Sequence, residues 1–294
     1  MRKKFISTLM LLSFCISLSA SQNMLVRSRL SMGTIAKLSA PNFQKEILQT
    51  SFERLKEIEK SLSSYDKKAL VYQLNNSLHV RLNEDIYKAL ELSKNYYKRS
   101  DGYFNIMIGA ITKDAYSFGE DEKVPSFYEL DLSKISFDGL SFDKNEANLS
   151  AGFKVDLGGM GKGFGVDEVY KLYLASDVKK GLIALSGDIR CIDNCSIEIQ
   201  NPFAEGIIGG FRSLKSGLAI STSGNYRRFV KEKKNHHLIN PKDKRPAKSF
   251  ASITLVSYTS SADLDAYATA ASVMPREKAL KFLDALFIHR KRRK

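Results

Sequence analysis

The stretch Val155–Val166 (VDLGGMGKGFGV) places a carboxylate and a lysine among closely spaced glycines. Five of the eight positions from 158 to 165 are glycine, where a helix is expected to begin. Backbone N–H groups exposed in such a curve at a helix N-terminus bind phosphate, and Lys162 adds a full charge. The stretch is neither a P-loop, because Asp156 and Gly163 stand at two of its required positions, nor a G-x-G-x-x-G motif. A tight turn that serves only close packing is the alternative.

Two further segments carry groups suited to the same chemistry. Asp265 and Thr269 are four residues apart, so on a helix they share a face and offer the hard oxygen ligands that Mg²⁺ prefers. Capping of that helix by Asp263 or Asp265 explains the pattern equally well. His237 follows another histidine near an expected turn and is a candidate for phosphate contact or proton transfer. The segments together indicate a phosphate-handling, metal-dependent pocket without naming a substrate.

The pattern of apolar residues predicts one compact α+β unit without internal repeats or linkers. A helix is expected to open at Pro41, Asn83 is expected to cap a second helix, and Pro275 is expected to begin the last one. Residues 120–152 are rich in loop signals. The other expected elements are strand-like pieces at 134–137 and 147–150, a helix at 163–174, strands at 181–190, 196–200, 206–213 and 250–258, and a helix at 264–274.

Cys191 and Cys195 are expected to bracket the turn of a hairpin, because an apolar run precedes them and alternating isoleucines follow. A disulfide at this place suits an oxidising compartment and, across so short a loop, stabilises the fold by about 2 kcal/mol. A metal site is disfavoured, because no histidine or further cysteine lies nearby in the sequence.

The two ends of the chain contribute more than half of its net charge of +14. Residues 1–20 run from basic to apolar to small residues, which predicts a secretory signal peptide. Lipid anchoring at Cys15 is not expected, because Phe14 stands where a lipoprotein signal needs a small residue. Residues 289–294 form a basic tail that is either solvated or attracted to anionic lipid of the inner membrane. The body, 21–288, carries only +6, so nucleic acid is not the expected partner.

A series of motifs along about four-fifths of the chain resembles the ApbE family of flavin transferases. Each motif is weak alone, whereas the series in this order is specific. The motifs are Met32-Gly33-Thr34, Leu62–Asp66 with Leu74-Asn75, Asp101–Asn105, Tyr116–Gly119, Asp156–Gly163, Ser186–Ile189, Thr222–Tyr226, His237–Pro241 and Asp265–Thr269.

The resemblance implies a T-fold-like mixed sheet and helix fold in a single catalytic unit, 21–288. It implies a periplasmic, Mg²⁺-dependent enzyme that transfers FMN from FAD to a threonine or serine hydroxyl of a flavoprotein subunit, releasing AMP. The usual acceptors belong to membrane redox complexes. Hydrolysis of FAD to FMN and AMP, or flavin binding without catalysis, are the alternatives. Asp265 and Thr269 speak against pure binding, because a carrier needs no metal clamp.

The resemblance also assigns roles to individual residues. Asp265 and Thr269 would ligate the metal with a main-chain carbonyl near Gly161, and these two residues with His237 would be catalytic. The residues expected to bind FAD are Met32 and Tyr65 beside the flavin, Asp156, Gly159 and Lys162 at the phosphates, Asp188 and Thr222 at the nucleotide, and His237 at the pyrophosphate. One departure is Asn240, where the family usually has Asp, so a relay from His237 to a carboxylate is in doubt.

Overall fold

A computed structural model describes residues 23–213 and 215–288, so the expected signal peptide and basic tail lie outside the described residues. Short 3-10 helices and one π-helix (Ala110–Ala115) occur in the connections. The helices and strands follow in the order β1 (Met24–Ser31), β2 (Thr34–Pro41), α1 (Glu46–Leu62), α2 (Leu70–Ser77), β3 (His79–Arg81), α3 (Glu84–Arg99), α4 (Phe127–Leu132), β4 (Leu140–Phe142), β5 (Glu146–Leu149), α5 (Gly161–Ala175), β6 (Leu182–Leu185), β7 (Asp188–Cys191), β8 (Cys195–Gln200), β9 (Ile207–Ser213), β10 (Ala219–Gly224), β11 (Ile239–Asn240), β12 (Arg245–Pro246), β13 (Ser252–Ser257), α6 (Ser261–Val273) and α7 (Arg276–Ile288).

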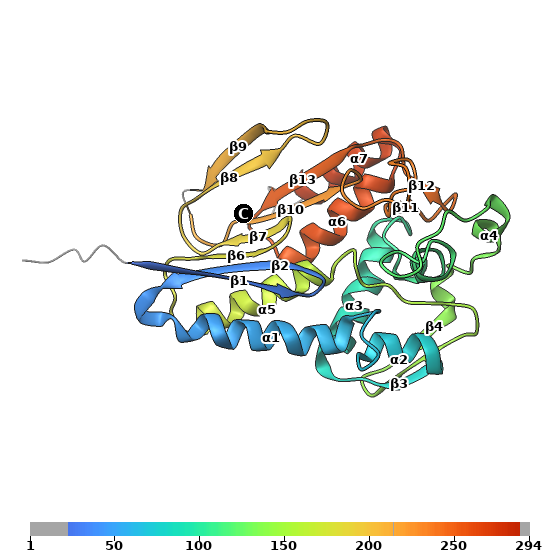
Figure 1. Ribbon diagram of the computed structural model, residues 1–294, viewed down its shortest axis with the longest axis horizontal. Helices are drawn as coiled ribbons and strands as arrows, with labels where there is room; N and C mark the ends of the chain where they lie inside the picture. The colour runs from blue at the N-terminus through green and yellow to red at the C-terminus, as the bar shows by residue number, and fades with distance from the viewer. Residues whose placement is uncertain (1–22, 214, 289–294) are drawn as a thin grey trace, which may run out of the picture.

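The main sheet is antiparallel and has the strand order β1-β2-β6-β7-β10-β13. Helices α5 and α6 pack on each other and on these strands, and α1 packs beside α5 against β1 and β2. In Figure 1, α1 and α5 lie on one side of the sheet and the β8–β9 hairpin lies on the other. The sheet is therefore covered by helices on one face and by a separate two-stranded hairpin on part of the other.

Alternation along β10 assigns its side chains to these two sides. Ser221 donates to the side chain of Asp188 on the neighbouring strand β7, and Ser223 contacts Thr269 of helix α6. Ile220 and Thr222 line the space under the hairpin. The pattern matters for the site because one strand supplies groups to both layers.

A smaller layer is built around α2, α3 and the sheet β3-β5-β4. The side chain of Asn83 accepts a hydrogen bond from the N–H of Ile86 at 3.1 Å, which confirms the expected cap of α3. The apolar residues of α1 are buried along one face, as the pattern of apolar residues predicts: Ile47, Leu48, Phe52, Leu55, Ile58 and Leu62. Within the described residues, no helix is long and apolar enough to cross a membrane.

Several expected boundaries are wrong, each for a local reason. The expected strand 181–190 is a hairpin of β6 and β7, because Ser186-Gly187 forms a two-residue turn with Ser186 at φ 56°. Pro41 ends β2 and directly precedes a 3-10 helix (Asn42–Gln44), so the α-helix expected from Pro41 begins only at Glu46. The piece 134–137 is not a strand; the strand in that region is β4.

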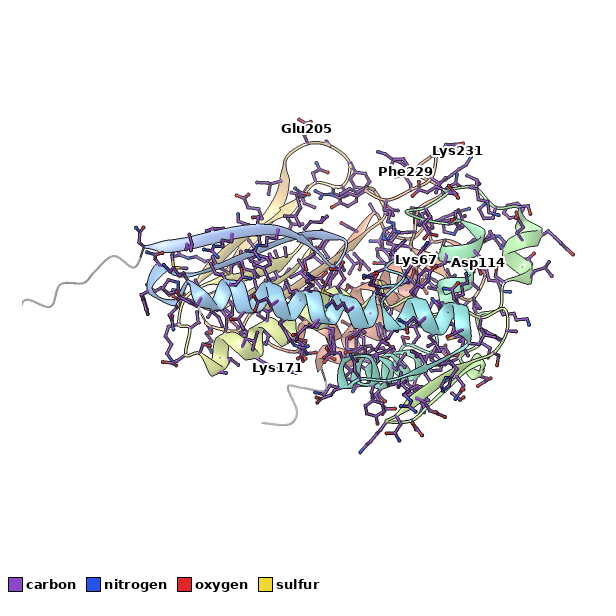
Figure 2. All side chains as sticks on the ribbon, turned by 60° about the horizontal axis from the view of Figure 1, so that its bottom comes forward. Lys67, Asp114, Lys171, Glu205, Phe229 and Lys231 are labelled. Carbon is purple, nitrogen blue, oxygen red and sulfur yellow. A yellow bond between two sulfur atoms is a disulfide. The ribbon has the colours of Figure 1, made fainter. Side chains whose placement is uncertain are left out.

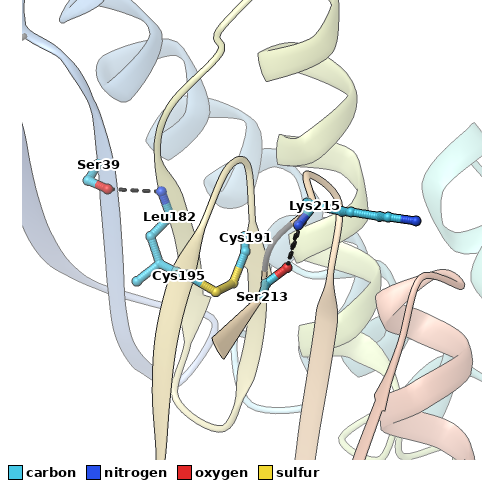
Figure 3. The surroundings of a disulfide bond; sticks show 6 residues. All are labelled: Ser39, Leu182, Cys191, Cys195, Ser213 and Lys215. Carbon is cyan, nitrogen blue, oxygen red and sulfur yellow. Dashed lines mark hydrogen bonds between the residues drawn. A yellow bond between two sulfur atoms is a disulfide. The ribbon is translucent and has the colours of Figure 1, made fainter. Parts of the chain in front are cut away.

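The expected disulfide between Cys191 and Cys195 is present, with their Cα atoms 6.0 Å apart (Figure 3). The hairpin expected around it is wrong, because β7 belongs to the main sheet and β8 pairs with β9 instead. The bridge therefore fixes the base of the β8–β9 hairpin to the main sheet. Ile197 and Phe211 pack beside it on the same apolar cluster.

Candidate active site

A cavity of about 1110 Å³ lies between the glycine loop, the main sheet and the β8–β9 hairpin. All but one of the side chains expected at the site line it. These are Met32, Tyr65, Asp156, Gly159, Gly161, Lys162, Thr222, His237, Asp265 and Thr269. The exception is Asp188, which is 1 % exposed and faces the helix layer.

The start of the glycine loop is held by side-chain amide and carboxylate groups. Asn75 donates to the carbonyl of Val155 at 2.8 Å and accepts from its N–H at 2.7 Å. Asp156 accepts from the hydroxyl of Thr112 at 2.7 Å and from the N–H of Gly158 at 2.9 Å. Burial opposes ionisation of Asp156, but Lys113 and these two donors hold its pKa below the ordinary value.

The expected nest of free backbone donors is wrong for most of the loop. The N–H groups of Met160 and Gly161 donate to the carbonyl of Leu157, and that of Gly163 donates to the carboxylate of Asp265 at 3.0 Å. Together with Gly158, four of these donors are already satisfied. The loop therefore offers a phosphate few free backbone donors, and side-chain cations or a metal would have to supply most of the binding.

Lys162 lies between two buried carboxylates. Its ammonium is 2.8 Å from Asp188 Oδ2 and 3.3 Å from Asp265 Oδ2. Burial lowers the affinity of Lys162 for its proton, but the two carboxylates outweigh it and raise the pKa. Burial and the neighbouring Asp188 raise the pKa of Asp265 to about 6. Lys162, Asp188 and Asp265 together carry a net charge of −1 when both carboxylates are ionised. This excess negative charge favours binding of a further cation.

Thr269 and Gly159 supply neutral oxygens beside that carboxylate group. The hydroxyl of Thr269 donates to the carbonyl of Gly159 at 3.2 Å and lies 3.3 Å from Ser223 Oγ. The carbonyl in contact with Thr269 is thus two residues before Gly161. Among the described residues no group of three or more His, Cys, Asp or Glu side chains is placed to hold a metal. One carboxylate with a hydroxyl and a carbonyl fits Mg²⁺ that keeps waters and binds substrate phosphates.

The imidazole of His237 is oriented by a backbone carbonyl. Its Nδ1 lies 3.1 Å from the carbonyl oxygen of Arg228, so Nδ1–H donates there in the neutral ring. Burial lowers the pKa of His237 to about 4; the cations of Arg228 and Lys162 act in the same direction, and the hydrogen bond opposes it. Nε2 is then left as an uncharged acceptor. The partner is not a carboxylate, consistent with Asn240 in place of the usual Asp.

Two cations line the cavity in addition to the residues that the resemblance assigns to the site. Lys113 lies 3.3 Å from the ring centre of Tyr65 and 3.7 Å from Asp156 Oδ2. Arg228 donates to the hydroxyl of Tyr65 and forms no salt bridge within the described residues. Arg228 stands in a polar turn whose cations the sequence does show, whereas Lys113 has no motif signal.

The bounds of α6 decide whether Asp263 and Asp265 cap this helix or face the site. Ser260 caps α6 by accepting from the N–H of Asp263, and Asp263 itself bonds to Tyr96 and Thr259. Asp265 lies inside α6 and points to the glycine loop. Capping of α6 by Asp263 or Asp265 is therefore wrong, because Ser260 is the capping residue.

The family model of the ApbE family matches residues 32–289, most of the chain. The chain belongs to the ApbE family. This membership agrees with the motif order and with the positions of nearly all the expected residues around one cavity.

Curated relatives and solved structures extend the ApbE comparison over the whole described fold. A protein named FAD:protein FMN transferase from Klebsiella pneumoniae is 24% identical over 280 residues, covering 89% of this chain and 88% of its own. One of the same name from Treponema pallidum is 27% identical over 277 residues, covering 82% and 76%. The ApbE crystal structure from Thermotoga maritima has a TM-score of 0.81 at 24% identity, covering 90% and 92%. Flavin transferase ApbE from Vibrio cholerae has a TM-score of 0.77 at 20% identity, covering 90% and 91%, so the expected fold class is confirmed.

Proposed function

We propose that this protein transfers the FMN part of FAD to a threonine or serine hydroxyl of another protein and releases AMP. The family membership and the relatives named FAD:protein FMN transferase support this activity. The observation that carries it is one cavity in which Lys162, Asp265 and Thr269 meet the glycine loop while His237 lines the same space.

The residues of the cavity suit this reaction. The acceptor oxygen bonds to the phosphorus on the FMN side of the pyrophosphate, the bond from that phosphorus to the bridging oxygen breaks, and AMP leaves. The hydroxyl proton goes to Nε2 of His237, which is uncharged near neutral pH. Lys162 and Arg228 would contact the phosphates, and Met32 and Tyr65 would flank the flavin. Such transfer needs chiefly positioning and charge neutralisation.

We further propose Mg²⁺ as the cofactor. Asp265, Thr269 and the carbonyl of Gly159 would hold it, in place of the carbonyl near Gly161 that the resemblance suggests. When bound, the ion would neutralise charge on the pyrophosphate. The excess negative charge around Lys162 supports this assignment.

The test is to incubate the mature chain with FAD, Mg²⁺ and flavoprotein subunits encoded in the same genome. We expect an acceptor mass increase equal to one FMN, with one AMP released for each transfer. AMP with free FMN and no mass increase would instead establish hydrolysis. Absence of both products would leave flavin binding alone and contradict the proposal. The Asp265→Asn variant is the control for a signal unrelated to this site.

Export to the periplasm is part of the proposal, supported by the signal pattern in residues 1–20 and by the disulfide. The acceptor would then be an exported or membrane-bound subunit of a redox complex. Fractionation of cells expressing the full chain, with the N-terminal sequence of the product, tests this. Uncleaved chain in the cytoplasm would contradict it.

A further inference from the structure

The excess positive charge of the chain body is concentrated in one segment. Residues 226–248, here called the basic segment, contain nine Lys and Arg but only two acidic residues, a net +7. The body from 21 to 288 carries +6, so the rest of it is close to neutral. A charge distribution of this kind steers and orients an acidic partner.

Few of these charges are matched within the protein. Lys234 pairs with Glu232, Arg245 pairs with Asp131, and Lys244 donates to main-chain carbonyls. The remaining six form no salt bridge within the described part of the chain. They are Arg227, Arg228, Lys231, Lys233, Lys242 and Lys248.

A second hollow of about 430 Å³ joins the basic segment to the active-site cavity. It is lined by the β8–β9 loop, 201–206, on one side and by Arg227 and Lys233 on the other. Gln200, Tyr226 and Arg227 line both spaces, so the hollow adjoins the cavity. Arg227 also donates to the side chain of Gln200, which links the hairpin to the basic segment.

The walls of the hollow combine an apolar and a basic surface. Phe203 lines the hollow from the loop and is 82% exposed, and the exposed Ile207 and Ile208 follow on β9 outside the lining. Figure 2 shows Glu205 at the tip of this loop, and Lys231 along the same edge of the molecule. Glu205 is the one acidic side chain of the lining. An extended chain with apolar and acidic residues would match these walls.

We propose that this hollow binds the acceptor polypeptide, through acidic residues that flank its hydroxyl-bearing residue. The inference rests on the proposed function, because a protein acceptor must bring its hydroxyl to the cavity that the hollow adjoins. The acidic flanks contact Lys233, Lys231 and Arg227, and an apolar side chain contacts Phe203. A concave site between two loops fits a polypeptide better than the flat surface of a membrane.

Binding is measured by fluorescence anisotropy with a labelled 13-residue peptide that has a central threonine, two Glu on each side and a Leu beyond each pair of Glu. A matched peptide carries Gln in place of every Glu. We expect FAD-loaded protein to bind the Glu peptide about tenfold more tightly, with a difference that shrinks as salt is raised. Lys231→Glu with Lys233→Glu should remove the preference, and Phe203→Ser should weaken binding of both peptides.

The control variant is Lys56→Glu with Lys144→Glu, two exposed lysines on α1 and in the β4–β5 turn that make the same change of charge. It should bind the Glu peptide like the unmodified protein, and all variants should keep their affinity for FAD. Equal binding of the two peptides, or none, would overturn the proposal. The proposal would also be overturned if the Lys231/Lys233 variant lost binding to vesicles of anionic phospholipid but kept its preference for the Glu peptide. That outcome would assign the basic segment to membrane binding. Because binding is the measurement, failure of FMN transfer would count against the proposed function alone.

Discussion

At the scale of single residues, the carboxylate of Asp265 has contacts that a structural residue would not need. It is 2 % exposed, yet it faces the cavity and accepts from Gly163 while it also contacts Lys162. Burial of a charge costs free energy unless it is paired. Its pKa is raised rather than lowered, which indicates that the protein alone does not fully compensate the charge.

Replacing Asp265 by Asn is expected to reduce Mg²⁺-dependent transfer by about 100-fold or more, because the variant loses the charge of the proposed metal ligand. Steady-state AMP release over a range of Mg²⁺ concentrations measures this. Asp263→Asn is the matched control: that side chain lies on the same helix but bonds to Tyr96 and Thr259. Full activity of Asp265→Asn would refute the metal assignment.

His237 is expected to remain neutral from pH 8 down to about pH 5. Burial places its pKa at about 4, below the ordinary 6.5, so between these values the unfolded chain binds the proton and the folded chain does not. The contribution of this group to stability is therefore intact above about pH 6.5 and is lost as pH falls towards 4. Ring signals followed by NMR, assigned by comparison with His237→Gln, test the value. A midpoint near 6.5 would contradict it and would weaken the case for a free acceptor at Nε2.

The sequence was informative about residues inside motifs and silent about residues outside them. Helix spacing places Asp265 and Thr269 on one face, and the dense glycines around Lys162 mark its loop, so local sequence predicts all three as site residues. Lys113 was missed, because only the folded chain brings it to Asp156, 43 positions later in the sequence. Asp188 was expected at the nucleotide, but strand alternation turns it to the helix layer.

At the scale of elements, α5 and α6 approach closely at one glycine. A Cβ on Gly163 would lie 2.4 Å from the carbonyl oxygen of Ser261 and 2.8 Å from Cβ of Asp265. The close approach brings the Gly163 N–H within hydrogen-bonding distance of Asp265. The packing of the two helices and the position of the Asp265 carboxylate thus both depend on the absence of a side chain at Gly163.

Gly163→Ala is expected to lower the free energy of unfolding by about 1–3 kcal/mol through overpacking. Transfer activity should fall as well, because the shift moves Asp265. Urea unfolding and AMP release are the two measurements. Gly161→Ala is the control, since a Cβ there meets no atom within 4 Å and its change in stability should stay within about 0.5 kcal/mol. Equal stability of the two variants would show that the helices can separate at no cost.

Long periodic helices and caps could be read from the sequence, whereas connections could not. The apolar face of α1 and the cap of α3 follow from local rules. The β6–β7 hairpin was read as one strand, because apolar residues continue on both sides of its Ser-Gly turn. Which sheet receives β8 depends on pairing with β9, and pairing partners are not encoded within a single strand.

At the scale of the whole molecule, the net charge of +14 is informative only by position. The expected signal and the tail carry eight of these charges outside the described residues, and the basic segment carries the excess of the body. The family match at 32–289 covers the basic segment but leaves most of both charged ends outside. Removing the charges at the ends of the chain and removing those of the basic segment should therefore have different effects in experiments.

Deletion of residues 289–294 is expected to leave FMN transfer and the melting temperature unchanged, because the lining of the cavity reaches no further along the chain than Val273. The melting temperature and kcat/KM for FAD test this, with the Lys56→Glu/Lys144→Glu chain controlling for the effect of lost positive charge. Sedimentation with anionic vesicles then separates the two interpretations of the tail. If the tail is only solvated, its deletion leaves vesicle binding unchanged. If the tail is attracted to lipid, its deletion weakens vesicle binding by about 1 kcal/mol per basic residue lost. A fall in FMN transfer after the deletion would mean that the tail contributes to the acceptor site. The positive charge that binds the acceptor would then extend beyond the basic segment.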